Sequence, residues 1–150
     1  MYLTKLLSTV TAAAVLSAVT LPAVAEQDGR HSIVLRPKEQ AMMLEDMRRY
    51  LHGIRKITTA LSREDNAAVE KAARELGTIA IYEVKPIAND PLVPRFRSLA
   101  TRLHEEFEEM ADAAKEGETP NQLLRRLSKL MNQCVKCHET YKTGSYPQQY

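Results

Sequence analysis

Residues 134–138, close to the C-terminus, have the sequence Cys-Val-Lys-Cys-His and so bring two thiols and an imidazole together. On a helix, positions three and four apart share one face, which lets both sulfurs reach the same edge of a flat ligand. The C-x-x-C-H spacing is the attachment signature of c-type haem. We therefore expect Cys134 and Cys137 to hold one haem c covalently, with His138 as the proximal ligand of its iron.

Other uses of the two cysteines need residues that this sequence lacks at the required spacing. A structural zinc site takes four ligands, and no second Cys or His pair has the usual spacing. A redox-active C-x-x-C follows a strand in a βαβ setting, whereas this pair lies in a predicted C-terminal helix. A disulfide between residues three positions apart would close a very short loop and contribute little stability. The residues therefore favour haem attachment.

The N-terminal segment, residues 1–25, has the pattern of a cleavable signal peptide. A positively charged start precedes an apolar run over residues 6–21, and the small residues Ala23 and Ala25 occupy the positions that a signal peptidase recognises. This run is shorter than the ~20 residues that a membrane-spanning helix needs. We expect cleavage after Ala25, which leaves an exported domain of residues 26–150 that does not span a membrane.

The charges of the chain are nearly balanced, with 21 Lys and Arg against 19 Asp and Glu. Such a balance gives no reason to expect a nucleic acid or an anionic membrane as partner. No nucleophile–base pair, glycine-rich phosphate loop or pair of catalytic carboxylates stands out in the sequence. We therefore expect a carrier or binding protein and not an enzyme.

Helical periodicity dominates the chain after residue 36. Pro37 and Pro120 are suited to the first turn of a helix, and Pro120 follows the capping residue Thr119. Ser62, with an acid three positions on, predicts the cap of a second helix, and Gly144 predicts the end of the last one. The predicted helices cover about residues 37–61, 62–84, 95–115 and 120–143, after an irregular lead over residues 26–35. Helices of this length joined by short connections predict an all-α fold, an antiparallel four-helix bundle with the haem bound covalently.

Two of these helices carry an apolar seam with steps of three and four residues. In the first helix the seam consists of Met43, Met47, Tyr50, Ile54, Ile57 and Leu61. In the fourth helix it consists of Leu124, Leu127, Met131, Cys134, His138 and Tyr141. We expect both seams to face the core, and we expect the acidic pairs at 105–106 and 108–109 to lie on outer faces of the third helix.

Residues 134–142, C-V-K-C-H-E-T-Y-K, together with a signal peptide and four predicted helices, resemble the cytochrome c prime family and its low-spin, methionine-ligated relatives. The resemblance covers the whole mature chain in layout and residues 134–142 as a specific motif. It implies a haem seated between the helices, a bacterial periplasmic location, and often a homodimer that pairs through the first two helices. It also implies that one side chain of the first helix lies over the distal face of the haem.

The type of this distal side chain separates two functions in the family. A methionine makes the iron six-coordinate and suited to electron transfer, whereas a non-ligating residue leaves it five-coordinate and open to small gases. We expect Met47 as the distal ligand, with Met43 as second choice, because Ile54 and Ile57 follow Met47 as inward residues follow the distal residue of the family. Both methionines could instead be core packing, and His104 is a further alternative ligand.

The sequence therefore predicts a periplasmic cytochrome that carries single electrons with His/Met axial ligation. Its expected partners are soluble or membrane-associated redox proteins. The alternative is a five-coordinate protein that binds nitric oxide or carbon monoxide on the same scaffold. One departure from the family is Met43, which lies four positions before Met47, where the family commonly has an arginine that pairs with a haem propionate. The propionate partner is therefore unassigned.

Overall fold

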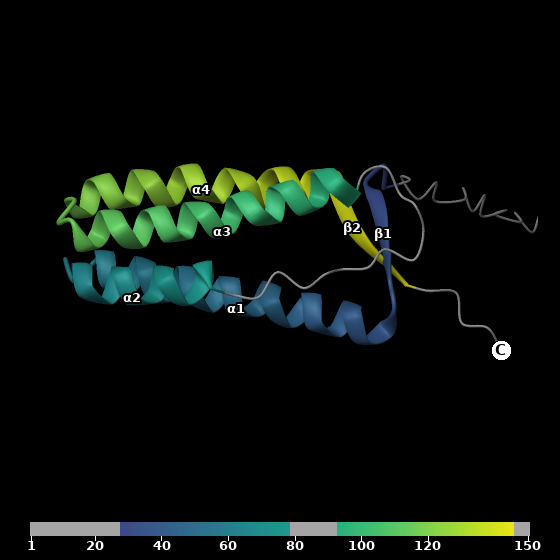
Figure 1. The fold of residues 1–150 in the computed structure, drawn as a ribbon, viewed down its shortest axis with the longest axis horizontal. Coiled ribbons are helices and arrows are strands. Elements are labelled where there is room, and N and C mark those ends of the chain that lie inside the picture. The colour runs from purple at the N-terminus through teal and green to yellow at the C-terminus, as the bar shows by residue number, and fades with distance from the viewer. Residues whose placement is uncertain (1–27, 79–92, 146–150) are drawn as a thin grey trace, which may run out of the picture.

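The structure, a computed structural model, describes residues 28–78 and 93–145, and this part of the chain is mostly helical. In chain order its elements are β1 (His31–Leu35), α1 (Pro37–Leu61), α2 (Asn66–Gly77), α3 (Val93–Lys115), α4 (Pro120–Thr140) and β2 (Tyr141–Ser145). The helices run lengthwise beside one another, and the strands lie at one end (Figure 1). None of the helices in these two ranges is long and apolar enough to cross a membrane. The predicted signal peptide lies outside the described residues. α2 ends at Gly77 with Thr78 as its C-terminal cap, so the prediction that this helix runs on without interruption to residue 84 is wrong, and residues 79–84 lie outside the described residues.

The first and fourth helices begin where the sequence predicts. Pro37 and Pro120 are the first residues of α1 and α4. Proline is favourable there because it lacks only an N–H that has no partner in the first turn. The Thr119 hydroxyl accepts a hydrogen bond from the backbone N–H of Gln122 at 3.4 Å, and the Gln122 side chain accepts one from the Thr119 backbone at 2.8 Å. This reciprocal cap fixes the start of the helix that carries residues 134–138.

The second helix is capped by Asp65 and not by Ser62, the predicted residue. Ser62 is the C-terminal cap of α1, and its hydroxyl donates to the carbonyl oxygen of Thr59 at 2.8 Å. The Asp65 carboxylate accepts a hydrogen bond from the backbone N–H of Ala68 at 2.9 Å, which is the usual role of a capping residue. A serine hydroxyl can bond to the preceding turn as well as to a following one, so the sequence pattern alone did not determine the cap.

The described chain also contains two β-strands, so the prediction of an all-α fold is wrong in this respect. β1 and β2 pair in parallel, in a register that runs from His31 opposite Tyr141 to Leu35 opposite Ser145. Parallel strands need a long crossover connection, and here all four described helices lie between the two strands in the chain. The sheet therefore joins the two ends of the described chain.

Burial explains why these strands form. Ile33 and Leu35 lie on the same face of β1 and are 3% and 0% exposed. They pack with Tyr141, the first residue of β2, in a small cluster that also contacts Met43, Phe96, Leu99 and Cys137. The prediction of an irregular lead over residues 26–35 is therefore wrong for His31–Leu35, which form β1. The predicted end of the fourth helix near Gly144 is also wrong, because α4 ends at Thr140 and Tyr141 begins β2.

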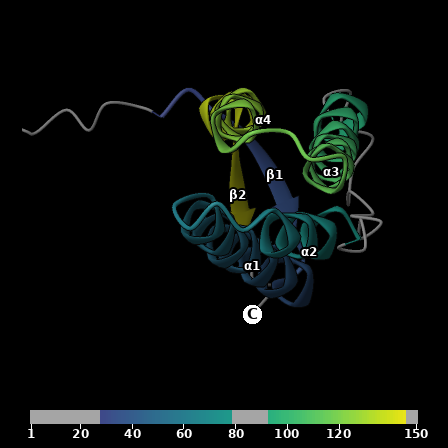
Figure 2. The same cartoon turned by 90° about the vertical axis from the view of Figure 1, so that its left-hand side faces the viewer.

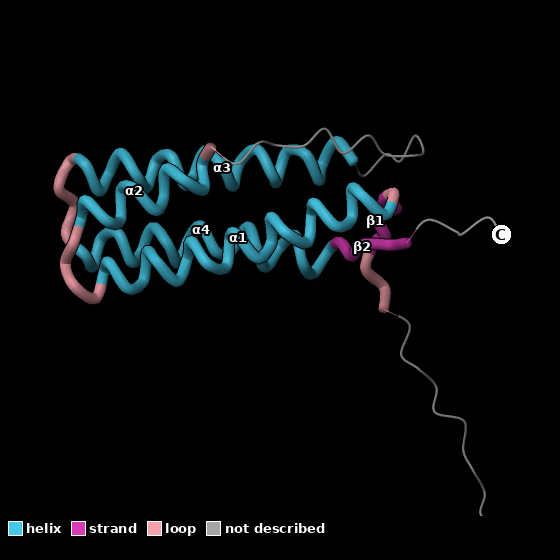
Figure 3. Tube along the Cα trace, turned by 90° about the horizontal axis from the view of Figure 1, so that it is seen from below, coloured by secondary structure: helices cyan, strands magenta, loops and turns pink. Residues whose placement is uncertain are grey.

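The main core lies between the helices, which form two layers. Figure 2 shows α1 and α2 in one layer and α3 and α4 in the other, and Figure 3 shows the described helix-to-helix turns at the end opposite the strands. α2 packs against α1 and α3, and α3 packs against α4, whereas α1 contacts α4 only sparsely. Gly53 permits the close approach of α1 to α2, because a Cβ there would lie 2.5 Å from the Leu76 side chain.

α4 turns a different face to the core than the sequence predicts. The buried residues of this helix are Leu123, Leu127 and Leu130. Leu124 and Met131, which the predicted seam places inside, are 51% and 42% exposed, and His138 is exposed as well. Both faces have apolar residues at steps of three and four, and Leu127 belongs to each, so periodicity could not choose between them.

α1 and α3 each depart from the prediction at one position. Met47, on the predicted seam of α1, is 38% exposed, although Ile57 and Leu61 of the same seam are buried. Glu106 is 8% exposed and faces α4, although the acidic pairs of α3 are predicted on outer faces. The seam of α1 is thus buried near the turn and more open toward the strands.

Candidate haem-attachment site

The motif of residues 134–138 lies in the last two turns of α4, shortly before the chain enters β2. Both Cys134 and Cys137 are free thiols and are half-buried. Cys137 contacts the small cluster under the sheet. The His138 imidazole is exposed and, within residues 28–78 and 93–145, makes no hydrogen bond or ion pair. The motif thus presents two thiols from a packed face and an imidazole from an open one.

The surroundings keep both thiols protonated at neutral pH. Burial raises the pKa of the Cys134 thiol, and the nearby Glu106 carboxylate raises it further. Burial also raises the pKa of the Cys137 thiol, with a contribution from Cys134. The thiolate is the attacking form in thiol–disulfide exchange, so these are not the activated cysteines of a redox enzyme.

Two residues of α1 show how that helix lies along the motif. Burial raises the pKa of the Tyr50 hydroxyl, and the nearby Asp46 carboxylate and then Cys134 raise it further, so Tyr50 and Cys134 lie in the same neighbourhood. Met43 packs on the same small cluster that Cys137 contacts. Met47 lies between Met43 and Tyr50 along α1, so it is level with the motif. The side chain of Met43 is therefore part of a packed cluster, whereas that of Met47 is open to a ligand.

Exposed apolar side chains form one stripe on α1 and another on α4. The stripe of α1 consists of Leu44, Met47 and Leu51, and the stripe of α4 consists of Leu124, Met131 and Val135. Their spacing places each stripe on one face of its helix, and His138 shares the face of the α4 stripe. Both stripes lie on the side of the helix that is not packed against α2 or α3. We call them the apolar stripes.

His104, the alternative ligand, is engaged elsewhere. It is 8% exposed, its Nε2 lies 2.9 Å from the Tyr50 hydroxyl, and its Nδ1 lies 3.1 Å from the carbonyl oxygen of Gly77. A carbonyl oxygen can only accept, so Nδ1 carries the proton and Nε2 accepts from Tyr50. Both ring nitrogens have partners, and His104 could bind iron only by losing one of them.

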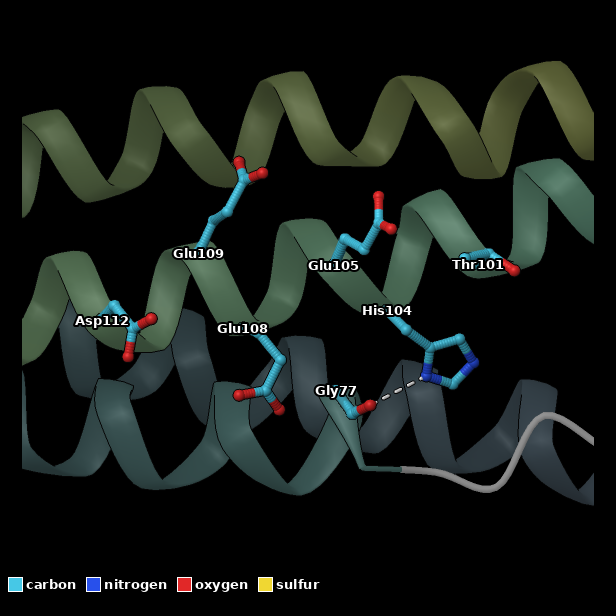
Figure 4. A pocket seen from close by; sticks show the side chains of 7 residues that line it. All are labelled: Gly77, Thr101, His104, Glu105, Glu108, Glu109 and Asp112. Carbon is cyan, nitrogen blue, oxygen red and sulfur yellow. Dashed lines mark hydrogen bonds between the residues drawn. The ribbon is translucent and has the colours of Figure 1, made fainter.

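A surface hollow of about 480 Å³ lies beside His104, between α2 and α3. Its carboxylates come from Glu105, Glu108, Glu109 and Asp112, and Figure 4 shows them on successive turns of α3. Figure 4 also shows the His104 ring directed to the Gly77 carbonyl. The hollow is acidic and includes no residue of the motif, so it is not where these thiols would hold an apolar group.

Glu106 is a residue next to the motif to which the sequence assigned no role. Its Oε1 accepts hydrogen bonds from Arg102 Nε at 3.0 Å and from Gln133 Nε2 at 3.2 Å. Its Oε2 is buried with no partner among the described residues. Helical spacing after Leu103, three positions earlier, would have indicated its inward position.

Arg30 is a second such residue. Its Nη1 donates to the main-chain carbonyl oxygen of His138 at 3.2 Å, across 108 positions of the sequence. No local pattern predicts this contact, because the acceptor is a backbone atom that every residue carries.

No family model, curated protein or solved structure matches the chain. Within the two described ranges, no group of three or more His, Cys, Asp or Glu side chains could hold a metal ion. The candidate site therefore rests on the chain's own residues. Two free thiols can form one thioether each, and the exposed imidazole of His138 can ligate an iron beside them. These donors fit a covalently held haem.

Proposed function

We propose that this protein is a c-type cytochrome that carries single electrons through one haem c. The observation that carries the proposal is the end of α4, where Cys134 and Cys137 are free and half-buried and the next side chain, His138, is an exposed imidazole. When bound, the haem supplies an iron that gains or loses one electron. The cysteines hold it by two thioether bonds, and His138 ligates the iron.

The apolar stripes support the same proposal. Leu51 is 70% exposed and Val135 is 51% exposed, on two helices that contact each other sparsely. Exposed apolar side chains that recur on one face mark a surface that a ligand or partner covers. A haem is a large, flat and mostly apolar group, and side chains of this kind exclude water from it. Because His138 shares the face of the α4 stripe, the same haem could be ligated by His138 and covered by the apolar side chains of this stripe.

Met47 is the proposed distal ligand, and Met43 is the second choice. Met47 is 38% exposed and level with the motif, whereas Met43 is packed on the small cluster under the sheet. A thioether opposite an imidazole favours the reduced iron and raises its reduction potential. This ligation suits a protein that passes electrons and leaves no open coordination position.

The proposal includes a finer fold and a cellular setting. The four helices form an antiparallel bundle around the haem, as in the cytochrome c prime family that residues 134–142 resemble. The signal peptide over residues 1–25 directs the chain to the periplasm. There it exchanges electrons with soluble or membrane-associated redox proteins, and a homodimer pairs through α1 and α2. The chain itself catalyses no reaction.

Denaturing mass spectrometry of the exported protein tests the attachment. The wild type should carry the mass of one haem. Cys134→Ala and Cys137→Ala should each keep the haem on one bond, and the double variant should carry none, because the chain has no other cysteine. Ser128→Ala, an exposed position of the same helix, is the control and should carry haem like the wild type.

Two results would contradict attachment: a wild type without haem, or haem mass that persists on the double variant. A visible spectrum then separates the two functions. A six-coordinate, low-spin iron supports the electron carrier. A high-spin iron that binds carbon monoxide readily would replace it with the five-coordinate gas-binding protein.

A further inference from the structure

Three charged side chains join the N-terminal segment to the haem motif. Arg30 Nη1 donates to the carbonyl oxygen of His138 at 3.2 Å. The Asp28 carboxylate holds the same guanidinium, with Oδ1 2.9 Å from Nε and Oδ2 2.7 Å from Nη2. Lys142 Nζ donates to the main-chain oxygen of Asp28 at 2.9 Å and lies 3.5 Å from its Oδ2. We call Asp28, Arg30 and Lys142 the clamp.

The clamp acts at the end of a helix, where backbone groups lack partners. The last four carbonyl groups of an α-helix have no intrahelical donor, and His138 is among them in α4. The carbonyl of Cys137 is satisfied by the backbone N–H of Tyr141. Arg30 supplies the donor for His138, and its positive charge lies at the negative end of the helix dipole. The backbone at the motif is thus held at two successive residues.

The Asp28 carboxylate fixes the orientation of the Arg30 guanidinium. A carboxylate that contacts a guanidinium through both oxygens fixes the plane of the guanidinium. The hydrogen bonds from Arg30 keep the pKa of the Asp28 carboxyl far below its usual range, so the pair stays ionised. Directly after Arg30, His31 pairs with Tyr141 in the parallel sheet. Asp28, before Arg30, and His31, after it, therefore both contact residues that directly follow α4.

We propose that Arg30 is a positioning residue for His138: by holding the main-chain carbonyl of His138, it fixes the direction in which the imidazole meets the iron. The inference rests on the proposed function, since only a bound haem gives the imidazole an iron to ligate. Groups that orient a ligating histidine tune the metal that it binds. Arg30 acts on the backbone of the ligand and leaves the imidazole itself free to bind.

Three full-length variants test the inference. Arg30→Gln removes the charge and the fork of donors, and Arg30→Lys restores the charge with a single donor group. Arg126→Gln is the matched control, because Arg126 also holds a carboxylate through two contacts, at 2.7 and 2.6 Å from the oxygens of Glu118, and these contacts involve no residue of the motif. Arg30 is 41% exposed at its side chain, so its loss should leave the fold intact.

Two measurements read the position of His138. Hydrogen exchange of the backbone amides over residues 137–142 should become faster in Arg30→Gln by up to about fivefold, as the loss of one exposed charged contact allows. Electron paramagnetic resonance of the ferric protein should show one set of g values in the wild type and in Arg126→Gln, and a second or broadened set in Arg30→Gln. Arg30→Lys should lie between them.

The outcomes decide between a positioning role and a structural one. Faster exchange together with altered g values supports positioning. Faster exchange with unchanged g values overturns it, because the backbone would then move without consequence for the ligand, and unchanged exchange overturns it as well. A wild type without covalent haem would overturn the proposed function by mass alone, before Arg30 is considered, and would leave the clamp with no ligand to position.

Discussion

The two ends of the molecule treat their apolar side chains differently. At the turn end, where α1 meets α2 and α3 meets α4, Ile57, Met110 and Leu123 are each 0% exposed. At the motif end, Met47, Met131 and Val135 of the apolar stripes stay exposed by 38% or more, although the small cluster under the sheet is packed. The apolar side chains of the turn end bury one another, whereas several apolar side chains of the motif end remain exposed to solvent. We infer that the turn end supplies stability and that the motif end supplies function.

His138→Ala should have the largest effect on function with little effect on stability. Covalent haem should remain, because both sulfurs are unchanged, but the native visible spectrum should be lost with the proximal ligand. The free energy of unfolding of the haem-free chain should change little, because the side chain is exposed. His52→Ala, exposed on α1, is the control. An unchanged spectrum in His138→Ala would mean that another residue, with His104 the first to examine, ligates the iron.

Phe107→Ala tests the main core between the helices, of which the turn end is part. Phe107 is fully buried, and its ring stacks on Tyr50 with centroids 5.9 Å apart. Truncating such a residue should lower the free energy of unfolding by about 3–5 kcal/mol, measured by urea denaturation. The haem spectrum of the folded variant should keep the features of the wild type. Lys129→Ala, exposed on α4, should stay within about 0.5 kcal/mol of the wild type, and an equal loss there would contradict the comparison.

Met47→Ala and Met43→Ala separate ligation from packing within the motif end. Met47→Ala should erase the weak near-infrared band of sulfur-to-iron charge transfer, open the iron to carbon monoxide and lower the reduction potential. Met43→Ala should keep the band and should cost about 2 kcal/mol of stability, the low end for a truncated methionine, because Met43 is only half-buried. An exchange of these two behaviours would move the distal ligand one turn along α1 and would leave the electron carrier in place.

The smallest effect is expected from acid at the Glu118–Arg126 pair. Hydrogen bonds from Arg126 lower the pKa of the Glu118 carboxyl in the folded protein. A carboxyl with a lowered folded pKa stabilises the fold above its ordinary pKa of about 4.3, and this contribution is lost as the pH falls further. Urea denaturation should therefore find wild type and Arg126→Gln different at neutral pH and alike in strong acid. A difference that grows as the pH falls would contradict the direction of this shift.

Local signals in the sequence predicted the helices well, and they failed where the deciding contact is distant. Proline and the cap at Thr119 act within one turn, so the starts of α1 and α4 could be predicted. The strands could not, because β1 is stable only against a segment at the other end of the described chain. The face that α4 buries was ambiguous because two apolar faces share Leu127, and the structure packs the one with Leu123 and Leu130 into the main core.

The candidate site divides in the same way. Residues 134–138 could be proposed as the site from spacing alone, since the signature depends on residue types within little more than one turn. The different settings of Met43 and Met47 could not, because burial of Met43 depends on the cluster with Ile33 and Leu35. The contact of Arg30 with the His138 carbonyl was equally inaccessible, since its acceptor carries no information in the sequence.

The parallel pairing of β1 with β2 also constrains the order in which the chain folds as it is synthesised. His31 is made early, and its partner Tyr141 follows 110 positions later, so the first strand must wait for nearly the whole polypeptide. Closing a loop of this length costs on the order of 4 kcal/mol in chain entropy, which favours formation of the sheet after the helices have shortened the distance. Until then both cysteines lie at the end of a helix that no strand has yet closed. The interval between the synthesis of the motif and the pairing of the strands is thus the period in which the two thiols are most accessible, and the proposed attachment of haem would fall in it.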